Sequence, residues 1–146
     1  MSNSAGSVKV LLVEDNPDDV EIARRALWKA AARVELSVAR DGQEALDMLF
    51  GRSNGDASLP HLVLLDLNLP KMDGREVLEK IKADPKLKRI PVVVLTVSTQ
   101  EEDVARCYDT GVNTYIAKPI QFEDFMRAVA TINEYWVGTA TLPSIE

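Results

Sequence analysis

The sequence predicts an α/β protein with an open, doubly wound sheet of five parallel strands, built from five strand–helix units, (βα)5. Short runs of Val and Leu recur without alternating polar residues, which is typical of strands that are buried on both faces. Segments with apolar residues three and four positions apart, typical of amphipathic helices, separate these runs. Strand–helix alternation implies parallel strands with right-handed crossovers. We therefore expect the helices to divide between the two faces of the sheet.

The five strands are predicted from apolar runs of different strength. Three runs are almost wholly apolar: Val8–Val13, Leu62–Leu65 and Pro91–Thr96. Two weaker candidates are Val34–Val38 and Asn113–Ala117. The strong runs suit strands that are buried on both faces, as in a parallel sheet.

The five helices are predicted from apolar stripes, and local stop signals set some of their ends. They span Asp18–Ala32, Gly42–Phe50, Gly74–Ala83, Ser98–Thr110 and Phe122–Val137. Asp18 is the predicted N-cap of the first helix because its side chain can accept from free backbone N–H groups. Pro85 ends the third, since proline disfavours helix at the residue before it. Gly111 ends the fourth as a left-handed cap.

The chain length of 146 residues suits one domain. We expect this domain to span residues 8–137, with a flexible N-terminal segment at 1–7 and a tail at 138–146. A tail of that length is too short to fold as a DNA-binding domain, so we expect a stand-alone domain. The polar loop 51–60 is predicted to be mobile.

Composition excludes several classes of protein. The 17 Lys and Arg against 23 Asp and Glu give a net charge of −6, which argues against a nucleic-acid surface. The single Cys and the single His, Cys107 and His61, exclude internal disulfides, multi-thiolate zinc sites and histidine clusters. No apolar run approaches the ~20 residues of a membrane span, and the N-terminus lacks the apolar core of a signal peptide. We therefore expect a cytoplasmic protein without a nucleic-acid or membrane partner.

Polar side chains stand where four of the predicted strands end. Glu14 and Asp15 follow the first strand, Asp66 follows the third, Thr96 ends the fourth and Lys118 follows the fifth. In an open parallel sheet these ends converge on one edge. The sequence therefore predicts a small site that holds three carboxylates, one hydroxyl and one ammonium group.

The chemistry of such a site is narrow. Neighbouring carboxylates repel one another and stay ionised together only when a cation neutralises them. Oxygen ligands without Cys or His suit a hard cation, Mg²⁺ or Ca²⁺. An ammonium and a hydroxyl group suit phosphate oxygens, and a carboxylate can itself attack phosphorus to give an aspartyl-phosphate. The arrangement predicts metal-assisted phosphoryl transfer onto an aspartate.

The sequence resembles the response-regulator receiver domains of bacterial two-component signalling, over about residues 8–137. The matching segments are Leu11–Asp15, Leu64–Pro70, Met72–Gly74, Pro91–Thr96 and Lys118–Pro119. The resemblance implies the flavodoxin-like receiver fold, as in single-domain, chemotaxis-regulator-like members. It also implies a two-component response regulator that accepts a phosphoryl group from a histidine kinase.

The resemblance assigns the acceptor and the metal ligands. Asp66 is the expected phosphoacceptor, in a reaction that requires Mg²⁺. Asp15 is expected to bind Mg²⁺ directly, and Glu14 directly or through water. Asn68 is expected to offer its backbone carbonyl to the metal.

The resemblance also assigns the groups that hold the phosphoryl group and report it. Thr96 is expected to hydrogen-bond the phosphoryl group, and Lys118 to pair with another of its oxygens. The bond between Lys118 and Pro119 is expected to be cis. Tyr115 matches the switch aromatic that turns inward with the threonine, although ordinary packing also explains a tyrosine there. Val97 departs from the small residue usual after the threonine, which places the phosphorylation rate in doubt.

Within this family, the segments 13–19 and 68–78 and the extended loop before the third predicted strand are similar to those of single-domain regulators paired with phytochrome-type histidine kinases. Such proteins are often homodimers through the region of helix 4, strand 5 and helix 5. Tyr135 and Trp136 end the last predicted helix, and an aromatic there suits an interface. Two interpretations of Trp136 remain open, an interface anchor and a residue that closes the core.

Other functions remain as alternatives. A stand-alone receiver can act by protein contact, as a phosphate shuttle to a carrier, or as a phosphate sink for its kinase. A phosphatase of the haloacid-dehalogenase type shares the aspartate, Mg²⁺ and lysine, but it needs an acid two residues after the nucleophile, where this chain has Asn68. A pseudo-receiver that only binds partners does not need the complete set of site residues. We expect no enzyme activity beyond self-catalysed phosphotransfer and autodephosphorylation.

Overall fold

The computed structural model describes residues 7–30, 34–51 and 59–144. Five strands and five α-helices alternate in these ranges. The strands are β1 (Val8–Val13), β2 (Val34–Ala39), β3 (Leu62–Leu65), β4 (Val92–Thr96) and β5 (Thr114–Ala117). The helices are α1 (Pro17–Ala30), α2 (Gly42–Phe50), α3 (Gly74–Ala83), α4 (Glu101–Thr110) and α5 (Phe122–Trp136), with a short 3₁₀ turn, η2 (Leu87–Arg89), before β4.

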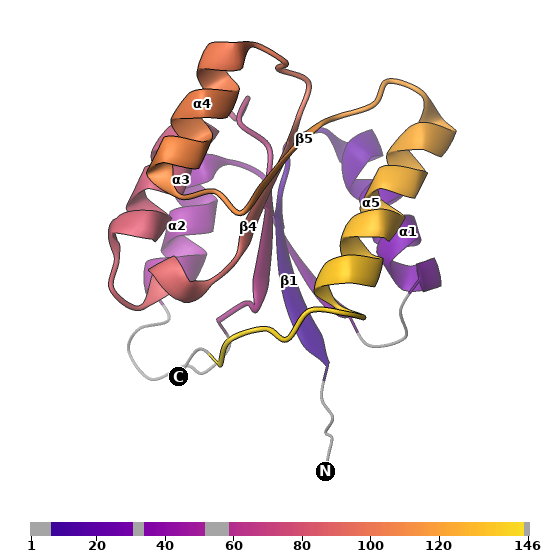
Figure 1. Cartoon of the computed structure of the whole chain (residues 1–146), viewed down its shortest axis with the longest axis horizontal. Helices are drawn as coiled ribbons and strands as arrows, with labels where there is room; N and C mark the ends of the chain where they lie inside the picture. Colours follow the sequence, from indigo (N-terminus) through magenta and orange to yellow (C-terminus); the bar gives the residue numbers. More distant parts are fainter. Residues whose placement is uncertain (1–6, 31–33, 52–58, 145–146) are drawn as a thin grey trace.

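The strands form one parallel sheet in the order β2-β1-β3-β4-β5. Helices α1 and α5 cover one face of the sheet, and α2, α3 and α4 cover the other (Figure 1). The predicted doubly wound (βα)5 architecture is confirmed. From β1 the chain adds β2 on one side, and it then adds β3, β4 and β5 on the other side. The carboxyl ends of β1 and β3 therefore lie at the point where the order of strand addition reverses, which is where such folds bind ligands.

The apolar runs are buried on both faces, as predicted. In β1, Val10 and Leu12 pack in the cluster under α1 and α5, while Leu11 and Val13 pack in the cluster under α2, α3 and α4. All four residues of β3 and all five of β4 are buried as well. These three strands therefore give the site a rigid base, because close-packed interiors leave little room for displacement.

Two helix starts differ from the prediction. Helix α1 begins at Pro17, and the Asn16 side chain accepts from the backbone N–H of Asp18 at 2.9 Å. Asn16 is therefore the N-cap, and the prediction of Asp18 is wrong, because proline favours the first helical position and fixes the cap one residue before it. Helix α4 begins at Glu101 rather than Ser98, since Ser98 bonds to groups outside its own turn.

Some expectations fall outside the described residues. The flexible N-terminal segment 1–7 lies there except for its last residue, and so does most of the loop 51–60 that was predicted to be mobile. Within the described part of the chain, no helix has the length and apolar character that crossing a membrane requires.

His61 is half-buried just before β3, and its ring hydrogen-bonds to the backbone of β1. Its Nδ1 accepts from the backbone N–H of Lys9 at 3.0 Å, and the backbone N–H of His61 donates to the Lys9 carbonyl. Burial lowers the pKa of His61 below its usual 6.5, and the charge of Lys9 acts in the same direction, against the opposing effect of Glu35. The neutral ring therefore belongs to the folded state.

We expect the stability provided by His61 to be fully present above about pH 6.5 and to be lost as the pH falls through its lowered folded-state pKa. The unfolded chain takes up the proton first, so acid favours unfolding. The variant His61→Gln cannot titrate, and the difference in unfolding free energy between the two proteins should shrink from pH 7 to pH 5. Because the chain has one His, its NMR titration is unambiguous. A pKa at or above 6.5 contradicts the prediction.

Candidate functional site

The predicted site residues meet at the carboxyl edge of the sheet. The backbone N–H of Asp66 donates to the carbonyl of Val13, which aligns the end of β3 with that of β1. On the other side, the backbone N–H of Lys118 donates to the carbonyl of Thr96. Parallel pairing therefore brings together residues that lie up to 104 positions apart in the chain.

Lys118 is the centre of an ion-pair cluster. Its Nζ lies 2.7 Å from Glu14 Oε1, 3.0 Å from Asp19 Oδ2 and 3.2 Å from Asp66 Oδ2. The Lys118 side chain is only 7 % exposed, and its Nζ also lies 5.8 Å from the centre of the Phe125 ring. One buried ammonium group therefore serves three carboxylates, with an aromatic face beside it.

The cluster has more negative charge than its lysine neutralises. Burial raises the pKa of Glu14 to about 7, helped by the charge of Asp66 and opposed by Lys118. Burial alone would lower the pKa of Lys118, but its hydrogen bond to Glu14 and the charges of Glu14 and Asp66 raise it above its usual value. Lys118 therefore stays protonated and charged, whereas the negative charge of Glu14 is not fully neutralised by its neighbours. A further cation would relieve this excess.

The acidic trio Glu14, Asp15 and Asp66 fits a divalent metal ion. Each residue offers one carboxylate oxygen, and these oxygens lie within 4.8 Å of one another. Glu14 and Asp66 are buried and Asp15 is exposed, so the trio opens to solvent on one side. An open set of oxygen donors suits a hard cation that keeps some of its waters. The three carboxylates that were predicted to hold a metal therefore lie together.

Asp66 is held at both oxygens. Its Oδ1 accepts from the Thr96 hydroxyl at 2.9 Å and from the backbone N–H of Asn68 at 3.1 Å, and its Oδ2 accepts from Lys118. Thr96 is fully buried at the end of β4. These contacts fix the orientation of the Asp66 carboxylate without a second acid at the Asn68 position.

Tyr115 lies apart from the carboxylates. Its ring packs against the core under α3 and α4, and its hydroxyl donates to the carbonyl of Ser98 at 2.9 Å. Ser98 stands two residues after Thr96, so Tyr115 contacts the segment that leads away from the site. Its backbone N–H donates to the hydroxyl of Tyr108.

The expected cis bond between Lys118 and Pro119 is not found. No peptide bond among the described residues is cis. The trans form is the intrinsically favoured one before proline, by about 0.5–1 kcal/mol. Lys118 reaches all three of its carboxylate partners with the trans bond.

Sequence reasoning missed Asp19 as a member of the site. Asp19 lies in the first turn of α1, where an acidic side chain commonly serves only to complement the helix dipole. Its carboxylate nevertheless points to Lys118. The available signal was its position, two residues into the helix that follows Glu14 and Asp15 at the carboxyl edge of the sheet.

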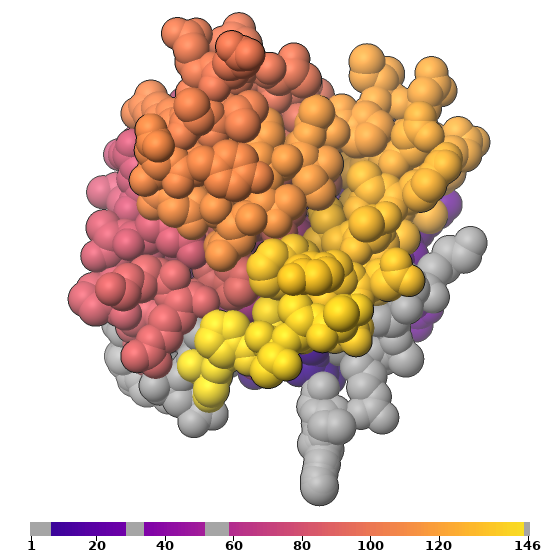
Figure 2. Space-filling model, viewed as in Figure 1, coloured from indigo at the N-terminus to yellow at the C-terminus, as the bar shows by residue number. Residues whose placement is uncertain are grey.

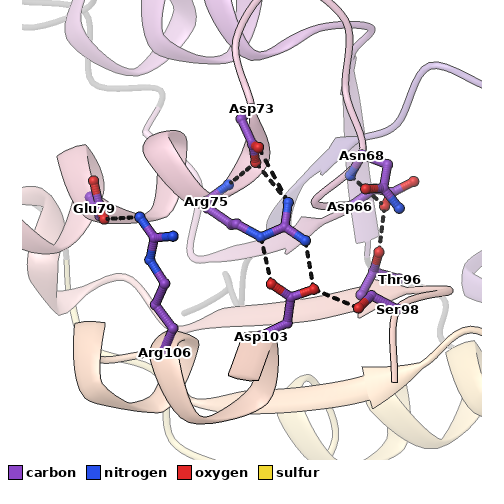
Figure 3. A network of polar contacts seen from close by, with 9 residues as sticks. All are labelled: Asp66, Asn68, Asp73, Arg75, Glu79, Thr96, Ser98, Asp103 and Arg106. Atoms are coloured by element: carbon purple, nitrogen blue, oxygen red, sulfur yellow. Dashed lines mark hydrogen bonds and ion pairs between the residues drawn. The ribbon is translucent and has the colours of Figure 1, made fainter. Parts of the chain in front are cut away.

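A polar network beside the site was missed as well (Figure 3). It joins Arg75 at the start of α3 to Asp103 at the start of α4, and then to Ser98. Neither Arg75 nor Asp103 carries a sequence signal of its own, since charged residues are common at helix starts.

Comparison with known proteins gives one consistent result. Residues 10–130 match the family model for the response regulator receiver domain. The curated response regulator Rcp1 of Synechocystis sp. is 44% identical over 146 residues, covering 99% of both chains. A probable methanogenesis regulatory protein, FilR2 of Methanothrix harundinacea, is 48% identical over 129 residues, covering 88% of this chain and 83% of the relative.

Solved structures agree with this result. The crystal structure of the phosphorylated cyanobacterial phytochrome response regulator RcpA superposes with a TM-score of 0.89 at 48% identity, covering 95% of this chain and 100% of that one. The Mn²⁺-bound form of response regulator Rcp1 superposes with a TM-score of 0.87 at 44% identity, covering 93% and 99%. The expected receiver fold is therefore confirmed.

Proposed function

Because the chain belongs to the response regulator receiver domain family, we propose that Asp66 accepts a phosphoryl group from a phosphohistidine of a sensor kinase, with Mg²⁺ as the cofactor. The observation that carries this proposal is the Asp66 carboxylate itself. It is buried, oriented by Thr96 and Lys118, and shares an acidic trio that fits a divalent cation. This chain is a response regulator of two-component signalling.

Each site residue has a separate role in the phosphoryl transfer. A carboxylate oxygen of Asp66 forms a bond to phosphorus, while the bond from phosphorus to the histidine nitrogen breaks and its electron pair stays on that nitrogen. When bound by Glu14, Asp15 and Asp66, Mg²⁺ supplies positive charge that offsets the carboxylates and the incoming phosphoryl oxygens. We also assign the backbone carbonyl of Asn68 to the metal, as the family resemblance implies.

Lys118 and Thr96 then exchange partners. Both groups donate to Asp66 before the transfer. Once one carboxylate oxygen is phosphorylated, the phosphoryl oxygens carry the negative charge, and the ammonium and hydroxyl groups can donate to them. Thr96 and Tyr115 carry the change to the outer surface, so that phosphorylation shifts an equilibrium between two conformations.

The first test is phosphorylation of the full chain by acetyl phosphate, followed by intact-mass measurement. We expect the mass gain of one phosphoryl group in Mg²⁺ or Mn²⁺, and no gain when the metal is chelated. A gain that is independent of metal, or no gain under conditions that label a known receiver domain, contradicts the proposal.

We further propose a phytochrome-type histidine kinase as the partner. The support is the similarity to RcpA, a phytochrome response regulator, over nearly the whole chain. We place the domain at residues 8–137, with short flanking segments on each side and action by protein contact in the cytoplasm.

We propose that the chain forms a homodimer through α4, β5 and α5. Figure 2 shows side chains of the orange α4–β5 region and the yellow α5 region on one face of the molecule. Tyr108 and Tyr135 are exposed. Trp136 packs against the core and edge-on to Tyr135, which favours its core role and leaves Tyr135 as the aromatic available for an interface.

Light scattering tests the dimer. We expect the mass of two chains for the phosphorylated protein, and a shift to the monomer mass in the variant Tyr135→Glu because a charge opposes burial in an interface. A monomer in both the phosphorylated and the unphosphorylated protein contradicts this prediction.

A further inference from the structure

A two-point ion pair joins α3 to α4 beside the site (Figure 3). Arg75 Nε donates to Asp103 Oδ1 at 2.8 Å, and Arg75 Nη2 donates to Asp103 Oδ2 at 2.7 Å. The two side chains are 20% and 16% exposed. The hydrogen bonds from Arg75 and Ser98 lower the pKa of Asp103 to about 2. Such a bidentate, partly buried pair holds its geometry better than a one-point surface pair.

The start of α4 depends on this ion pair. Gln100, at the N-cap position, makes no side-chain capping bond. Asp103 stands at the third helical position, where an acid commonly bonds back to the N-cap backbone. Here its Oδ2 instead accepts from the Ser98 hydroxyl at 2.6 Å, farther back along the chain. The first turn of α4 is therefore tied to Arg75 and Ser98 rather than capped by its own residues.

Ser98 is held at both ends. Its hydroxyl donates to Asp103, and its carbonyl accepts from the Tyr115 hydroxyl. Two residues earlier, Thr96 donates to Asp66. The position of Asp103 therefore determines the position of the Ser98 carbonyl that accepts from Tyr115. This carbonyl belongs to the same short segment as Thr96.

Arg75 is anchored on the opposite side, next to the acceptor aspartate. Asp73 caps α3 by accepting from the Arg75 backbone N–H at 2.8 Å, and it also accepts from Arg75 Nη1 at 3.0 Å. The backbone N–H of Gly74 donates to Leu67 at 2.9 Å, and a Cβ at Gly74 would collide with the Asp66 carbonyl. The start of α3 therefore packs directly on the backbone of Asp66 and Leu67.

We propose that Arg75 is a positioning residue for the switch. Through Asp103 it holds Ser98 where the Ser98 carbonyl accepts from Tyr115, and so it favours the conformation with Tyr115 packed on the core and Thr96 turned to Asp66. We name Arg75, Asp103 and Ser98 the α3–α4 clamp. The inference rests on the proposed function, and it adds that this clamp sets how readily the chain takes up a phosphoryl group.

The chain contains a matched control for the clamp. Arg106 Nη2 lies 3.3 Å from Glu79 Oε2, which is a second ion pair between the same two helices. Its side chains are 63% and 48% exposed, and neither bonds to Ser98. If the clamp acted only by joining α3 to α4, loss of either pair would have similar consequences.

The test compares Arg75→Met with Arg106→Met in the full chain. The first readout is the ring NMR signal of Tyr115 in ¹³C-tyrosine-labelled protein without metal, assigned with Tyr115→Phe. The second is the affinity for beryllium fluoride, a phosphoryl mimic, in Mg²⁺. We expect Arg75→Met to move the Tyr115 signal toward that of an exposed ring and to weaken binding at least about fivefold. Arg106→Met should leave both readouts unchanged.

Ser98→Ala tests whether Arg75 acts on Tyr115 through Asp103 and the Ser98 hydroxyl. It removes the hydroxyl that connects Asp103 to the loop, so adding Arg75→Met to it should change binding much less than Arg75→Met does alone. Arg75→Lys, which offers one contact point, should recover part of the loss. Additive effects of the two changes, or an unchanged Tyr115 signal in Arg75→Met, overturn the proposal.

The outcomes also separate the two proposals. If the wild-type chain binds no beryllium fluoride, the proposed function fails, while the Tyr115 signal of the metal-free protein still decides the clamp. If Arg75→Met does not fold, Asp103→Asn replaces it, because asparagine keeps the shape and one acceptor but removes the charge. A Tyr115 signal identical to wild type in Asp103→Asn refutes the clamp.

Discussion

The variant Asp66→Asn takes up no phosphoryl group from acetyl phosphate in Mg²⁺. The amide lacks the anionic oxygen that attacks phosphorus, and it removes one carboxylate from the acidic trio that fits a divalent metal ion. The amide oxygen can still accept from Thr96 and from the backbone of Asn68, so the fold should be retained. Intact-mass measurement after incubation should show full labelling of wild type and none of the variant.

Asp124→Asn is the matched control for this experiment. Asp124 is exposed on α5 and pairs with Arg127, away from the site. It should be labelled as wild type is. Labelling of Asp66→Asn to the wild-type extent would place the acceptor on another residue and refute the assignment.

The second large effect is expected from Lys118→Met. Its ammonium is the shared partner of three carboxylates, two of them almost fully buried. Removing one partner of a buried ion pair leaves uncompensated charge and costs about 3–5 kcal/mol. We therefore expect the unfolding free energy at pH 7 without metal to fall by about 3 kcal/mol. Mg²⁺ should restore part of this loss, because a bound cation again neutralises the acids.

Lys82→Met separates this electrostatic effect from loss of packing. Lys82 Nζ donates to three neutral oxygens, of Lys88, Ile90 and Asn113, and burial lowers its pKa. Its loss should also destabilise the fold, but Mg²⁺ should not restore it. Denaturant titrations with and without Mg²⁺ measure both effects. Equal recovery of the two variants, or no destabilisation in Lys118→Met, contradicts the electrostatic account.

The sequence was sufficient to predict the site residues that stand at strand ends. The apolar runs before Glu14 and Asp66 are largely buried on both faces, so their assignment as strands of a parallel sheet follows from hydrophobicity. The topology of parallel sheets then brings the strand ends to one edge, which is why Lys118 meets residues near the other end of the chain.

Contacts between helices were not predictable in the same way. The pairing of Arg75 with Asp103 depends on how α3 and α4 are rotated toward each other, and no local pattern encodes that rotation. Asp19 joins the site for the same kind of reason. The cap of α1 was predicted at Asp18, but Pro17 takes the first helical position and so makes Asn16 the cap.

The assembly of the cluster around Lys118 has a consequence for the folding pathway. The acidic residues come from the first half of the chain, whereas their cation follows β5, the last strand to be synthesised and an edge strand of the sheet. A partly folded chain that has docked β1 against β3 but not yet β5 carries the mutual repulsion of the carboxylates without relief. Such an intermediate is penalised relative to the complete sheet. The same charges that prepare the site for chemistry therefore make folding more cooperative.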